Sequence, residues 1–341
     1  MITMDKIRWG VIGCGGIARK RTLPGFLLAE NSECVAVVSA SASTVDAVAE
    51  EFHIGKRYYS VDELLADPQI DAVYIASPLR NHKEQIIAAA KAGKHILCEK
   101  PMCLTVEDEK EMEKFCREQG VKLGVGFMMR FHGAHEEMKR IIASGGIGEI
   151  VSAYAVFNSD YPANEKLWRQ SKANSAGGAM MDMGIHCIDL LRYISGMDAQ
   201  LVTAVCGNQI HKYPDVEDAG TVVMRMDNGA IFTVQANFNI PDAVGGCSFM
   251  IMGRTGSLTA MNTVGQTSTG TLYHVDLSSG SAESRVIPYS TDNMYARELD
   301  AFSKAIIGDT LPPVGAGECI KDQSIIEAAY RSSELGVHEK L

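Results

Sequence analysis

The sequence lacks a long apolar run, a cluster of basic residues and any closely spaced pair of cysteines, and each absence excludes a class of protein. Its longest apolar stretches, such as residues 34–40, are far shorter than the roughly 20 residues that span a bilayer. Residues 1–8 contain no apolar signal segment. We therefore expect no membrane partner and a cytoplasmic location.

The charge balance is acidic, with 42 Asp and Glu against 32 Lys and Arg and a net charge of −10. Binding to a nucleic acid needs a basic surface that neutralises phosphates, so we expect no nucleic-acid partner. The nine cysteines are scattered and form no CxxC pair. This distribution predicts reduced, mostly buried thiols and neither a disulfide framework nor a zinc site.

The length of 341 residues predicts two domains, and a composition that is 46% hydrophobic and 22% charged supplies apolar surface for two cores. In the first third, short β-branched runs alternate with helical patterns. Strands are expected at 7–12, 34–39, 72–77, 95–99 and 123–127. A capping box at Ser60 and Glu63 and a cap at Thr105 start two of the intervening helices. The pattern predicts a doubly wound parallel sheet, a Rossmann domain, over residues 1–127.

Residues 128–341 show longer alternating strands, expected at 150–157, 201–206, 221–226, 231–237 and 249–252, and helices at 134–143, 294–307 and 323–335. Asp227-Asn228-Gly229 is a strong hairpin signal. We predict a C-terminal α+β domain with a large, mainly antiparallel sheet that is open on one face, so the overall class is α/β. A second subunit commonly closes such a face, which predicts a homo-oligomer, a dimer or a tetramer.

The segment Gly13-Cys14-Gly15-Gly16-Ile17-Ala18 directly follows the first expected strand and opens a helix. In this context Gly13 allows a tight turn, Gly15 lets the backbone approach a pyrophosphate, and the helix start holds negative charge. The alternative is a glycine-rich turn that binds nothing. The order of strand, turn and helix favours a dinucleotide site.

The end of the second strand decides which dinucleotide is preferred. Residues 39–44 contain Ser39, Ser41, Ser43 and Thr44 but neither an acidic residue for a ribose 2′-hydroxyl nor a basic one for a 2′-phosphate. The missing carboxylate removes repulsion against a phosphate, and Arg19 or Arg21 could bind it. The cofactor is therefore NAD or NADP, with a slight preference for NADP.

Two further groups carry candidate chemistry. Lys100, in Glu99-Lys100-Pro101, lies at the end of a strand, where ligands bind in open α/β sheets, although a lone lysine is more often a surface residue. Asp182 and His186 are four residues apart in a helical pattern, with Asp189 following and Gly177-Gly178 upstream. A capping Asp beside a core His is the alternative. A metal site of Asp182, His186 and Asp189 has little support, and no metal is expected.

These three motifs, in this order and spacing, resemble the Gfo/Idh/MocA oxidoreductases over nearly the whole chain. Supporting matches are Leu23-Pro24-Gly25-Phe26, Ser77-Pro78 with His82, Gly126-Phe127 with Arg130, Trp168-Arg169, and Tyr295. The resemblance implies an enzyme that transfers a hydride between nicotinamide and a carbinol or ketone carbon of a sugar, cyclitol or related polyol. Lys100, Asp182 and His186 match the family's catalytic trio.

The resemblance also implies which residues line the cofactor cleft. The matching positions, taken with their neighbours in the same motifs, are Gly13, Gly15, Gly16, Ile17, Ser39, Ser41, Thr44, Ser77, Pro78, His82, Glu99, Lys100, Arg130, Trp168, Arg169 and Tyr295. Two positions depart from the family pattern. Thr44 stands where NADP-using members carry a basic residue, which leaves the cofactor open, and Ala176-Gly177-Gly178 replaces a glycine triplet.

Proteins that share this resemblance have two other known functions. Some members oxidise a sugar transiently with NAD, eliminate its glycosidic substituent and reduce it again, and a galactose-pathway repressor uses the fold to sense dinucleotide without catalysis. The intact trio counts against a sensor. Substrate specificity is expected in the loop 158–175 and in the antiparallel sheet, with Asp160, Tyr161, Asn164 and Lys166 as candidate hydroxyl-binding residues.

Overall fold

The computed structural model describes residues 6–164, 168–241, 243–277 and 279–341, and the chain divides into two compact units. The first unit comprises Met1–Met128 and Asn293–Ile320, and the second comprises Met129–Asp292 and Lys321–Leu341. Residues 293–320, which the sequence analysis assigned to the C-terminal region, thus pack with the first unit. The division into domains at residue 127 stays a prediction.

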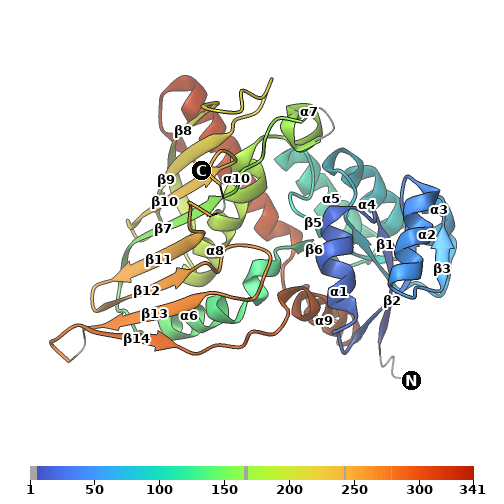
Figure 1. The fold of residues 1–341 in the computed structure, drawn as a ribbon, viewed down its shortest axis with the longest axis horizontal. Coiled ribbons are helices and arrows are strands. Elements are labelled where there is room, and N and C mark those ends of the chain that lie inside the picture. Colours follow the sequence, from blue (N-terminus) through green and yellow to red (C-terminus); the bar gives the residue numbers. More distant parts are fainter. Residues whose placement is uncertain (1–5, 165–167, 242, 278) are drawn as a thin grey trace. The chain divides into compact units, whose positions relative to one another are not determined.

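The first unit is built on a six-stranded sheet whose strand order is β3-β2-β1-β4-β5-β6 and whose pairings are all parallel (Figure 1). Its strands are β1 (Ile7–Ile12), β2 (Ser32–Val38), β3 (Lys56–Tyr58), β4 (Ala72–Ile75), β5 (His95–Glu99) and β6 (Leu123–Gly126). The predicted Rossmann topology is confirmed. β3 was not predicted, because its three residues are a polar edge strand without an apolar run.

The first unit also contains eight helical segments among its described residues. They are η1 (Ala18–Thr22), α1 (Leu23–Phe26), α2 (Ala42–Glu51), α3 (Val61–Ala66), η2 (Leu79–Asn81), α4 (His82–Lys91), α5 (Val106–Glu118) and α9 (Met294–Ile307). Two predicted caps are confirmed: the Ser60 hydroxyl accepts the N–H of Glu63 at 3.2 Å, and the Thr105 hydroxyl accepts that of Asp108 at 3.1 Å. Glu63 in turn accepts the N–H of Tyr59 instead of that of Ser60.

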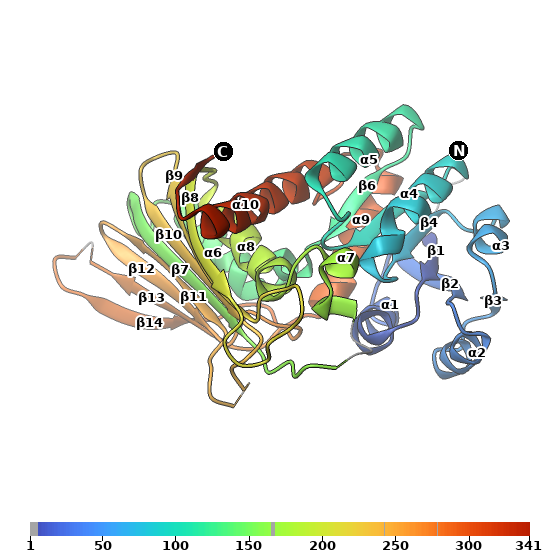
Figure 2. The same cartoon turned by 90° about the horizontal axis from the view of Figure 1, so that it is seen from above.

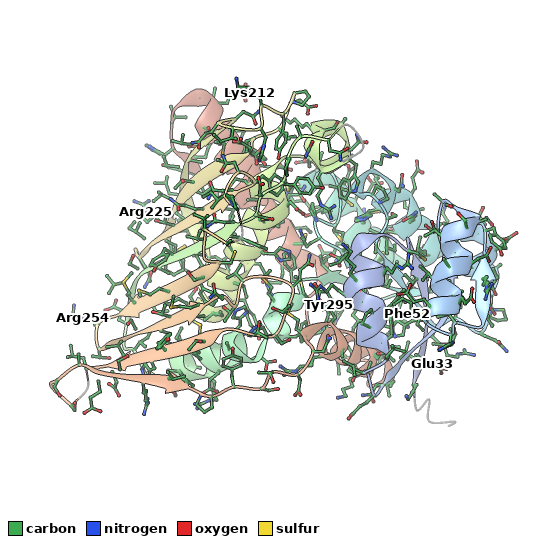
Figure 3. All side chains as sticks on the ribbon, viewed as in Figure 1. Glu33, Phe52, Lys212, Arg225, Arg254 and Tyr295 are labelled. Carbon is green, nitrogen blue, oxygen red and sulfur yellow. The ribbon has the colours of Figure 1, made fainter. Side chains whose placement is uncertain are left out.

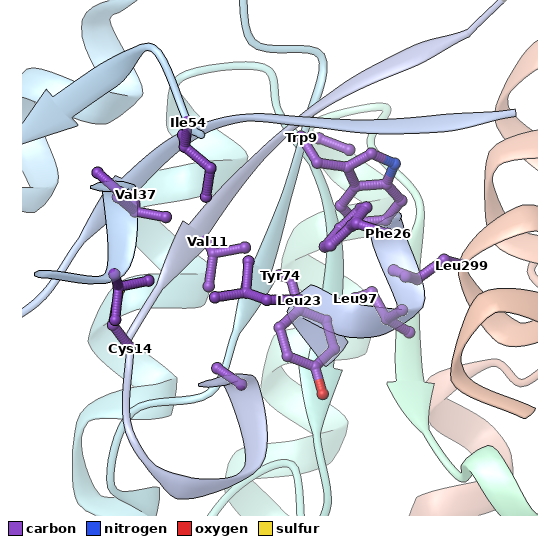
Figure 4. Packing of buried hydrophobic residues seen from close by; sticks show 14 of the residues in the cluster. Trp9, Val11, Cys14, Leu23, Phe26, Val37, Ile54, Tyr74, Leu97 and Leu299 are labelled. Atoms are coloured by element: carbon purple, nitrogen blue, oxygen red, sulfur yellow. The ribbon is translucent and has the colours of Figure 1, made fainter. Parts of the chain in front are cut away.

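The helix α9 joins the first unit because its apolar stripe fits beside β1. Figure 4 shows Leu299 in one buried cluster with Trp9 and Phe26. The Trp9 indole N–H donates to the hydroxyl of Ser303 at 3.0 Å, and its ring lies 5.6 Å from that of Phe302. A helix nearly 300 residues away in sequence therefore completes the core over β1.

The second unit contains a nine-stranded sheet in the order β14-β13-β12-β11-β7-β10-β9-β8-β15. Its strands are β7 (Ile150–Asn158), β8 (Ala199–Gly207), β9 (Ala219–Met226), β10 (Ile231–Asn237), β11 (Ser248–Gly253), β12 (Gly256–Met261), β13 (Thr271–Asp276), β14 (Glu283–Ile287) and β15 (Glu339–Lys340). Only β7 and β10 pair in parallel among these described strands, which confirms the mainly antiparallel prediction. The sequence analysis did not predict β12 to β15, whose short polar-rich runs are recruited by pairing with their neighbours.

Helices cover one face of this sheet, as Figures 1 and 2 show for α6, α8 and α10. The helical segments that lie wholly or mostly in the second unit are η3 (Met128–Phe131), α6 (Gly133–Ala143), η4 (Trp168–Gln170), α7 (Lys172–Ser175), η5 (Met180–Gly184), α8 (Ile185–Ser195) and α10 (Ala316–Leu335). α10 begins seven residues before the predicted start at 323. Its first turns show no apolar stripe in the sequence, because the polar Asp322 is buried there against Arg192. No helix in the described part of the chain is long and apolar enough to cross a membrane.

Candidate active site

The glycine turn after β1 places its backbone against the end of β4. Gly13 has φ +97°, and a Cβ atom built on it would lie 2.6 Å from the backbone N of Ser77 and 2.7 Å from the carbonyl carbon of Ala76. Its own N–H donates to the carbonyl of Val38 at 2.8 Å. Only glycine fits here, for both conformational and steric reasons.

The next glycines differ from Gly13, because a Cβ atom on Gly15 or Gly16 would meet no atom within 4 Å. Helical hydrogen bonding starts at Gly15, whose carbonyl accepts the N–H of Arg19 at 2.9 Å. A helix start next to open space suits an anion, because the first N–H groups have no helical acceptor. The turn therefore fits the pyrophosphate of a dinucleotide, and side chains at Gly15 and Gly16 would fill that space.

Hydroxyl groups gather where β2 ends and α2 begins. The Ser41 hydroxyl caps α2 by accepting the N–H of Thr44 at 3.4 Å, and it lies 2.8 Å from the hydroxyl of Ser43. Arg19, one candidate for a 2′-phosphate, instead pairs with Glu51 at 2.6 Å. Glu51 is the last residue of α2, so this pair is roughly 15 Å along the helix from Ser41.

His82 links the turns that follow β4 and β5. Its Nε2 lies 2.8 Å from the carbonyl of Ser77, and its Nδ1 lies 3.2 Å from the carbonyl of Met102 and 3.4 Å from Cys98 Sγ. Burial lowers the pKa of His82. The sequence analysis expected Ser77, Pro78 and His82 to line the cofactor cleft. The structure shows that His82 ties the Ser77 turn to the segment that follows Lys100.

The residue before Lys100 is Glu99, whose carboxylate is fixed by hydrogen bonds. β5 ends at Glu99, which accepts hydrogen bonds from the phenol of Tyr74 and, at 3.3 Å, from the N–H of Lys100. The Thr22 hydroxyl donates to the Tyr74 oxygen at 3.0 Å. The peptide bond from Lys100 to Pro101 is cis. Tyr74 was not singled out from the sequence, although a tyrosine inside an otherwise aliphatic buried strand was a usable signal.

Tyr295, labelled in Figure 3, lies in the first turn of α9 and belongs to the same unit. Burial and the negative charge of Glu99 raise the pKa of its phenol. Its Cβ lies 3.0 Å from where a Cβ on Gly25 would be, so glycine at this position lets α9 approach α1. The predicted residues Glu99, Lys100 and Tyr295 thus come together with Tyr74 in the first unit.

Asp182 and His186 lie in the second unit, Asp182 on a π-helical turn, η5, and His186 in the first turn of α8, which follows η5 directly. π-helical turns are frequent at functional sites. His186 is buried beside Phe157, with the ring centroids 6.4 Å apart. The half-buried Asp182 accepts a hydrogen bond from Arg169 Nε at 3.4 Å, and Arg169 stacks over Trp168 at 4.5 Å. The predicted group Trp168, Arg169, Asp182 is therefore one cluster.

Asp189 does not join that cluster. Its Oδ1 accepts hydrogen bonds from Arg130 Nε and Nη2 at 2.8 and 2.5 Å, with both side chains buried. Arg130 also lies 4.8 Å from the ring centre of Tyr193. Arg130, expected to line the cofactor cleft, therefore has a carboxylate partner in its own unit. No group of three His, Cys, Asp or Glu residues that could hold a metal occurs among the described residues.

The glycines before η5 are pressed against two residues that the sequence analysis did not identify. A Cβ on Gly178 would lie 1.9 Å from the carbonyl oxygen of Glu217, and one on Gly177 would lie 2.1 Å from the phenol oxygen of Tyr330. Burial raises the pKa of Glu217. The sequence predicts that another group comes close to Gly177 and Gly178, and the fold shows that these groups are Tyr330 and Glu217.

The expected specificity loop is anchored by hydrogen bonds to the segment 208–218. The carbonyl of Tyr161 accepts a hydrogen bond from the Tyr213 phenol, and Asp160 Oδ1 lies 3.1 Å from His211 Nε2. The buried Asp218 accepts three backbone N–H groups, those of residues 209–211, at 2.8 to 2.9 Å. The N–H of Asn164 donates to Gln170 at 2.8 Å. Lys166 lies outside the described residues.

The predicted trio is divided between the two units, with Lys100 in the first and Asp182 and His186 in the second. The nine cysteines are free thiols, as expected, and those at 14, 98, 103, 116, 187 and 319 are buried.

Comparison with known proteins identifies two family regions. Residues 7–127 match the family described as "Oxidoreductase family, NAD-binding Rossmann fold", and residues 135–259 match the "GFO/IDH/MocA C-terminal domain". The chain is 37% identical to a 1,5-anhydro-D-fructose reductase of Ensifer adhaerens, over 89% of this chain and 90% of that protein. It is 28% identical to a D-xylose 1-dehydrogenase (NADP(+)) of Haloferax volcanii, over 98% and 99%.

Among solved structures, a levoglucosan dehydrogenase in complex with NADH and levoglucosan superposes with a TM-score of 0.89 at 25% identity. The superposition covers 98% of this chain and 99% of the other. The likeness therefore extends over both units.

Proposed function

The chain belongs to the Gfo/Idh/MocA oxidoreductase family, and from this premise we propose that it transfers a hydride between a nicotinamide cofactor and a carbinol or ketone carbon of a sugar or related polyol. The observation that carries the proposal is the glycine turn, where Gly13 is forced to be glycine by its neighbours and Gly15 and Gly16 face open space. A polyol substrate is favoured because the relatives compared are named for sugars and sugar derivatives.

The residues that would hold the dinucleotide are those of the glycine turn, the serine and threonine residues within 39–44, and Ser77. When bound, nicotinamide supplies the carbon that accepts or donates the hydride. His186 takes the proton of the substrate hydroxyl on an imidazole nitrogen. Asp182, held by Arg169, orients His186 and favours its charged form. The Lys100 ammonium donates a hydrogen bond to the substrate oxygen and stabilises its alkoxide character. The same groups, run in reverse, reduce a ketone.

The slight preference for NADP rests on the absence of any acidic residue at 39–44. The relatives differ: one is named for NADP(+) and another was solved with NADH. The engagement of Arg19 by Glu51 weakens one expected phosphate contact. Separate titrations with NAD⁺ and NADP⁺, followed by protein fluorescence, test the preference, and a lower Kd for NAD⁺ would reverse it.

A homo-oligomer is proposed through the uncovered face of the second sheet. One row of paired residues crosses it from β9 to β14, and its apolar members are Val223, Tyr154, Met250, Tyr273 and Val286. Val223, Tyr154 and Val286 are 38%, 38% and 61% exposed in the single chain. A row in which apolar side chains predominate, interrupted by Thr233 and Thr259, suits burial by a second copy. Whether it is a dimer or a tetramer, and the cytoplasmic location, stay predictions.

The decisive experiment follows nicotinamide absorbance while the protein is incubated with NAD⁺, NADP⁺ and their reduced forms, against free sugars, cyclitols, keto-sugars and aryl glycosides. The proposal expects a change in absorbance with at least one polyol or ketone. Release of an aglycone without net NADH would instead assign a glycoside-cleaving activity. Tight dinucleotide binding with no turnover of any substrate would favour a regulator.

A further inference from the structure

The helix that carries Asp182 and His186 begins without a capping side chain of its own. η5 is preceded by Ala179, whose backbone is already helical and whose methyl group accepts no hydrogen bond. Helical hydrogen bonding starts at Gly178, whose carbonyl accepts the N–H of Asp182 at 3.0 Å. The N–H groups of residues 178–180 therefore need acceptors from another part of the chain.

Glu217, two residues before β9 begins, supplies those acceptors. Its Oε2 accepts the N–H of Gly178 at 3.0 Å, and its Oε1 accepts the N–H of Met180 at 2.8 Å. Its backbone carbonyl accepts the N–H of Ala179 at 3.2 Å. One residue thus accepts hydrogen bonds from three consecutive N–H groups, and this residue is only 8% exposed. Hydrogen bonds of this kind are strong because a carboxylate is the acceptor and water is excluded.

A second residue holds the carboxylate in place. The Tyr330 phenol, on α10, donates to Glu217 Oε1 at 2.8 Å. Burial raises the pKa of Tyr330 well above its usual range, so the phenol stays a donor. The glycines make this possible, since side chains at Gly177 or Gly178 would overlap Tyr330 or Glu217. The two N–H groups and the phenol are all donors, which suits an acceptor-only carboxylate.

We propose that Glu217 is a positioning residue for the reaction, because its buried carboxylate caps the helix that carries Asp182 and His186 and, held by Tyr330, sets the depth and rotation of that helix. The inference rests on the proposed function, since it assumes that Asp182 and His186 act on the substrate. Asp182 is two residues beyond the last capped N–H. A shift of this first turn therefore moves the Asp182 carboxylate directly, and displacements near 1 Å can cost up to about 100-fold in rate.

Matched variants separate positioning from stability. Glu217→Gln keeps the shape but turns one acceptor into an amide donor, Glu217→Ala removes both oxygens, and Tyr330→Phe removes the phenol that donates to Oε1 while the carboxylate stays in place. As a control, Asn228→Ala removes a hairpin side chain that accepts the N–H of Ala230 at 2.9 Å and donates to the carbonyl of Ile150 at 3.1 Å. Asn228 is in the same unit but has no contact with η5 among those described.

The first readout does not depend on activity. Hydrogen exchange of a peptide covering residues 176–186, measured by mass spectrometry, should accelerate at least tenfold in Glu217→Gln and less in Tyr330→Phe. The control should leave this peptide unchanged while lowering the unfolding midpoint. If the peptide exchanges at the wild-type rate in both Glu217→Gln and Tyr330→Phe, the capping role is wrong, whatever the enzyme does.

The second readout is turnover at saturating substrate. Glu217→Gln should lower kcat roughly tenfold, Glu217→Ala more, and Tyr330→Phe less, with the dinucleotide Kd unchanged in each. Unchanged kcat in the Gln and Phe variants would overturn the positioning role. His186→Ala, run in parallel, separates the two proposals, because a fully active His186→Ala would contradict the proposed function while the exchange result still decides whether Glu217 caps the helix.

Discussion

Gly13 and Gly15 are two residues apart in one turn, yet a methyl group should harm the protein at these positions in different ways. At Gly13 the added Cβ meets backbone atoms of Ala76 and Ser77 at 2.6 to 2.9 Å and the backbone φ is positive, whereas at Gly15 it meets nothing within 4 Å. Gly13→Ala should lower the free energy of unfolding by about 1–2 kcal/mol or more.

Gly15→Ala should unfold at the wild-type midpoint without cofactor but bind dinucleotide at least roughly tenfold more weakly, because its methyl group occupies the space assigned to the pyrophosphate. Thermal unfolding with and without NAD⁺ or NADP⁺ measures both effects. Wild-type affinity in Gly15→Ala would show that the dinucleotide does not approach the turn closely.

His186 is the residue proposed to take the proton of the substrate hydroxyl. If its imidazole takes the hydroxyl proton, His186→Ala should lower kcat by about 10² to 10⁴-fold. The dinucleotide Kd should hardly change, because the glycine turn lies in the other unit. Steady-state rates and a fluorescence titration provide the comparison. A variant with full kcat would remove His186 from the mechanism.

At the scale of an element, a carboxylate on α9 adds hydrogen bonds to the apolar packing that docks this helix in the first unit. Asp300 accepts the backbone N–H groups of Glu30 at 2.8 Å and Asn31 at 2.7 Å, and it lies 3.3 Å from the hydroxyl of Ser32. Asp300→Ala leaves these donors without that acceptor and should lower the free energy of unfolding by about 1–3 kcal/mol. Urea unfolding measures the loss. The control is Glu118→Ala, which removes an exposed ion pair with Lys114 on α5 and should change little.

The buried His135, in the first turn of α6, should make the stability of the protein depend on pH. His135 Nδ1 lies 2.7 Å from the carbonyl of Met129, its Nε2 lies 3.0 Å from the hydroxyl of Thr263, and its ring stacks on His132. Burial, with a contribution from His132, lowers the pKa of His135 from 6.5 to about 3. Between these values the unfolded chain binds a proton that the folded chain does not.

Stability should therefore fall as the pH drops from 6.5 towards 3, with this group contributing up to about 1.4 kcal/mol per pH unit. Urea unfolding at pH 7 and pH 5 tests this. His135→Asn should show a shallower dependence on pH than the wild type, and replacing the exposed His338 by Asn should leave the slope as it is. Equal slopes in all three proteins would contradict the assignment.

At the scale of the whole molecule, the uncovered sheet face sets the expected assembly. Tyr154 lies in the middle of the exposed row, paired with Thr233 on β10 and Met250 on β11. A lysine there would have to be buried without a partner in an interface, so Tyr154→Lys should dissociate the oligomer in sedimentation velocity. Leu311→Lys, at an 88% exposed position in the other unit, should not. A wild-type protein that sediments as a monomer at micromolar concentration would contradict the oligomer itself.

The sequence alone determined the parts of this protein that depend on local periodicity and on motif spacing. It determined the parallel first sheet, the mainly antiparallel second sheet, the caps at Ser60 and Thr105, and the glycine turn, because each is encoded within a few neighbouring residues. The edge strands at 56–58 and 339–340 escaped prediction, since pairing with a neighbouring strand, and not their own composition, makes them strands.

Only the tertiary structure decided which distant residues meet. In the fold, α9 packs against Trp9, and Asp189 pairs with Arg130 instead of joining Asp182 and His186. His82 connects two turns, and Glu217 and Tyr330 pack against Gly177 and Gly178. Such pairs are separated by up to hundreds of residues, and each member by itself has ordinary local chemistry. Their partners are chosen by the packing of whole elements, because buried donors and acceptors must satisfy one another wherever the chain brings them together.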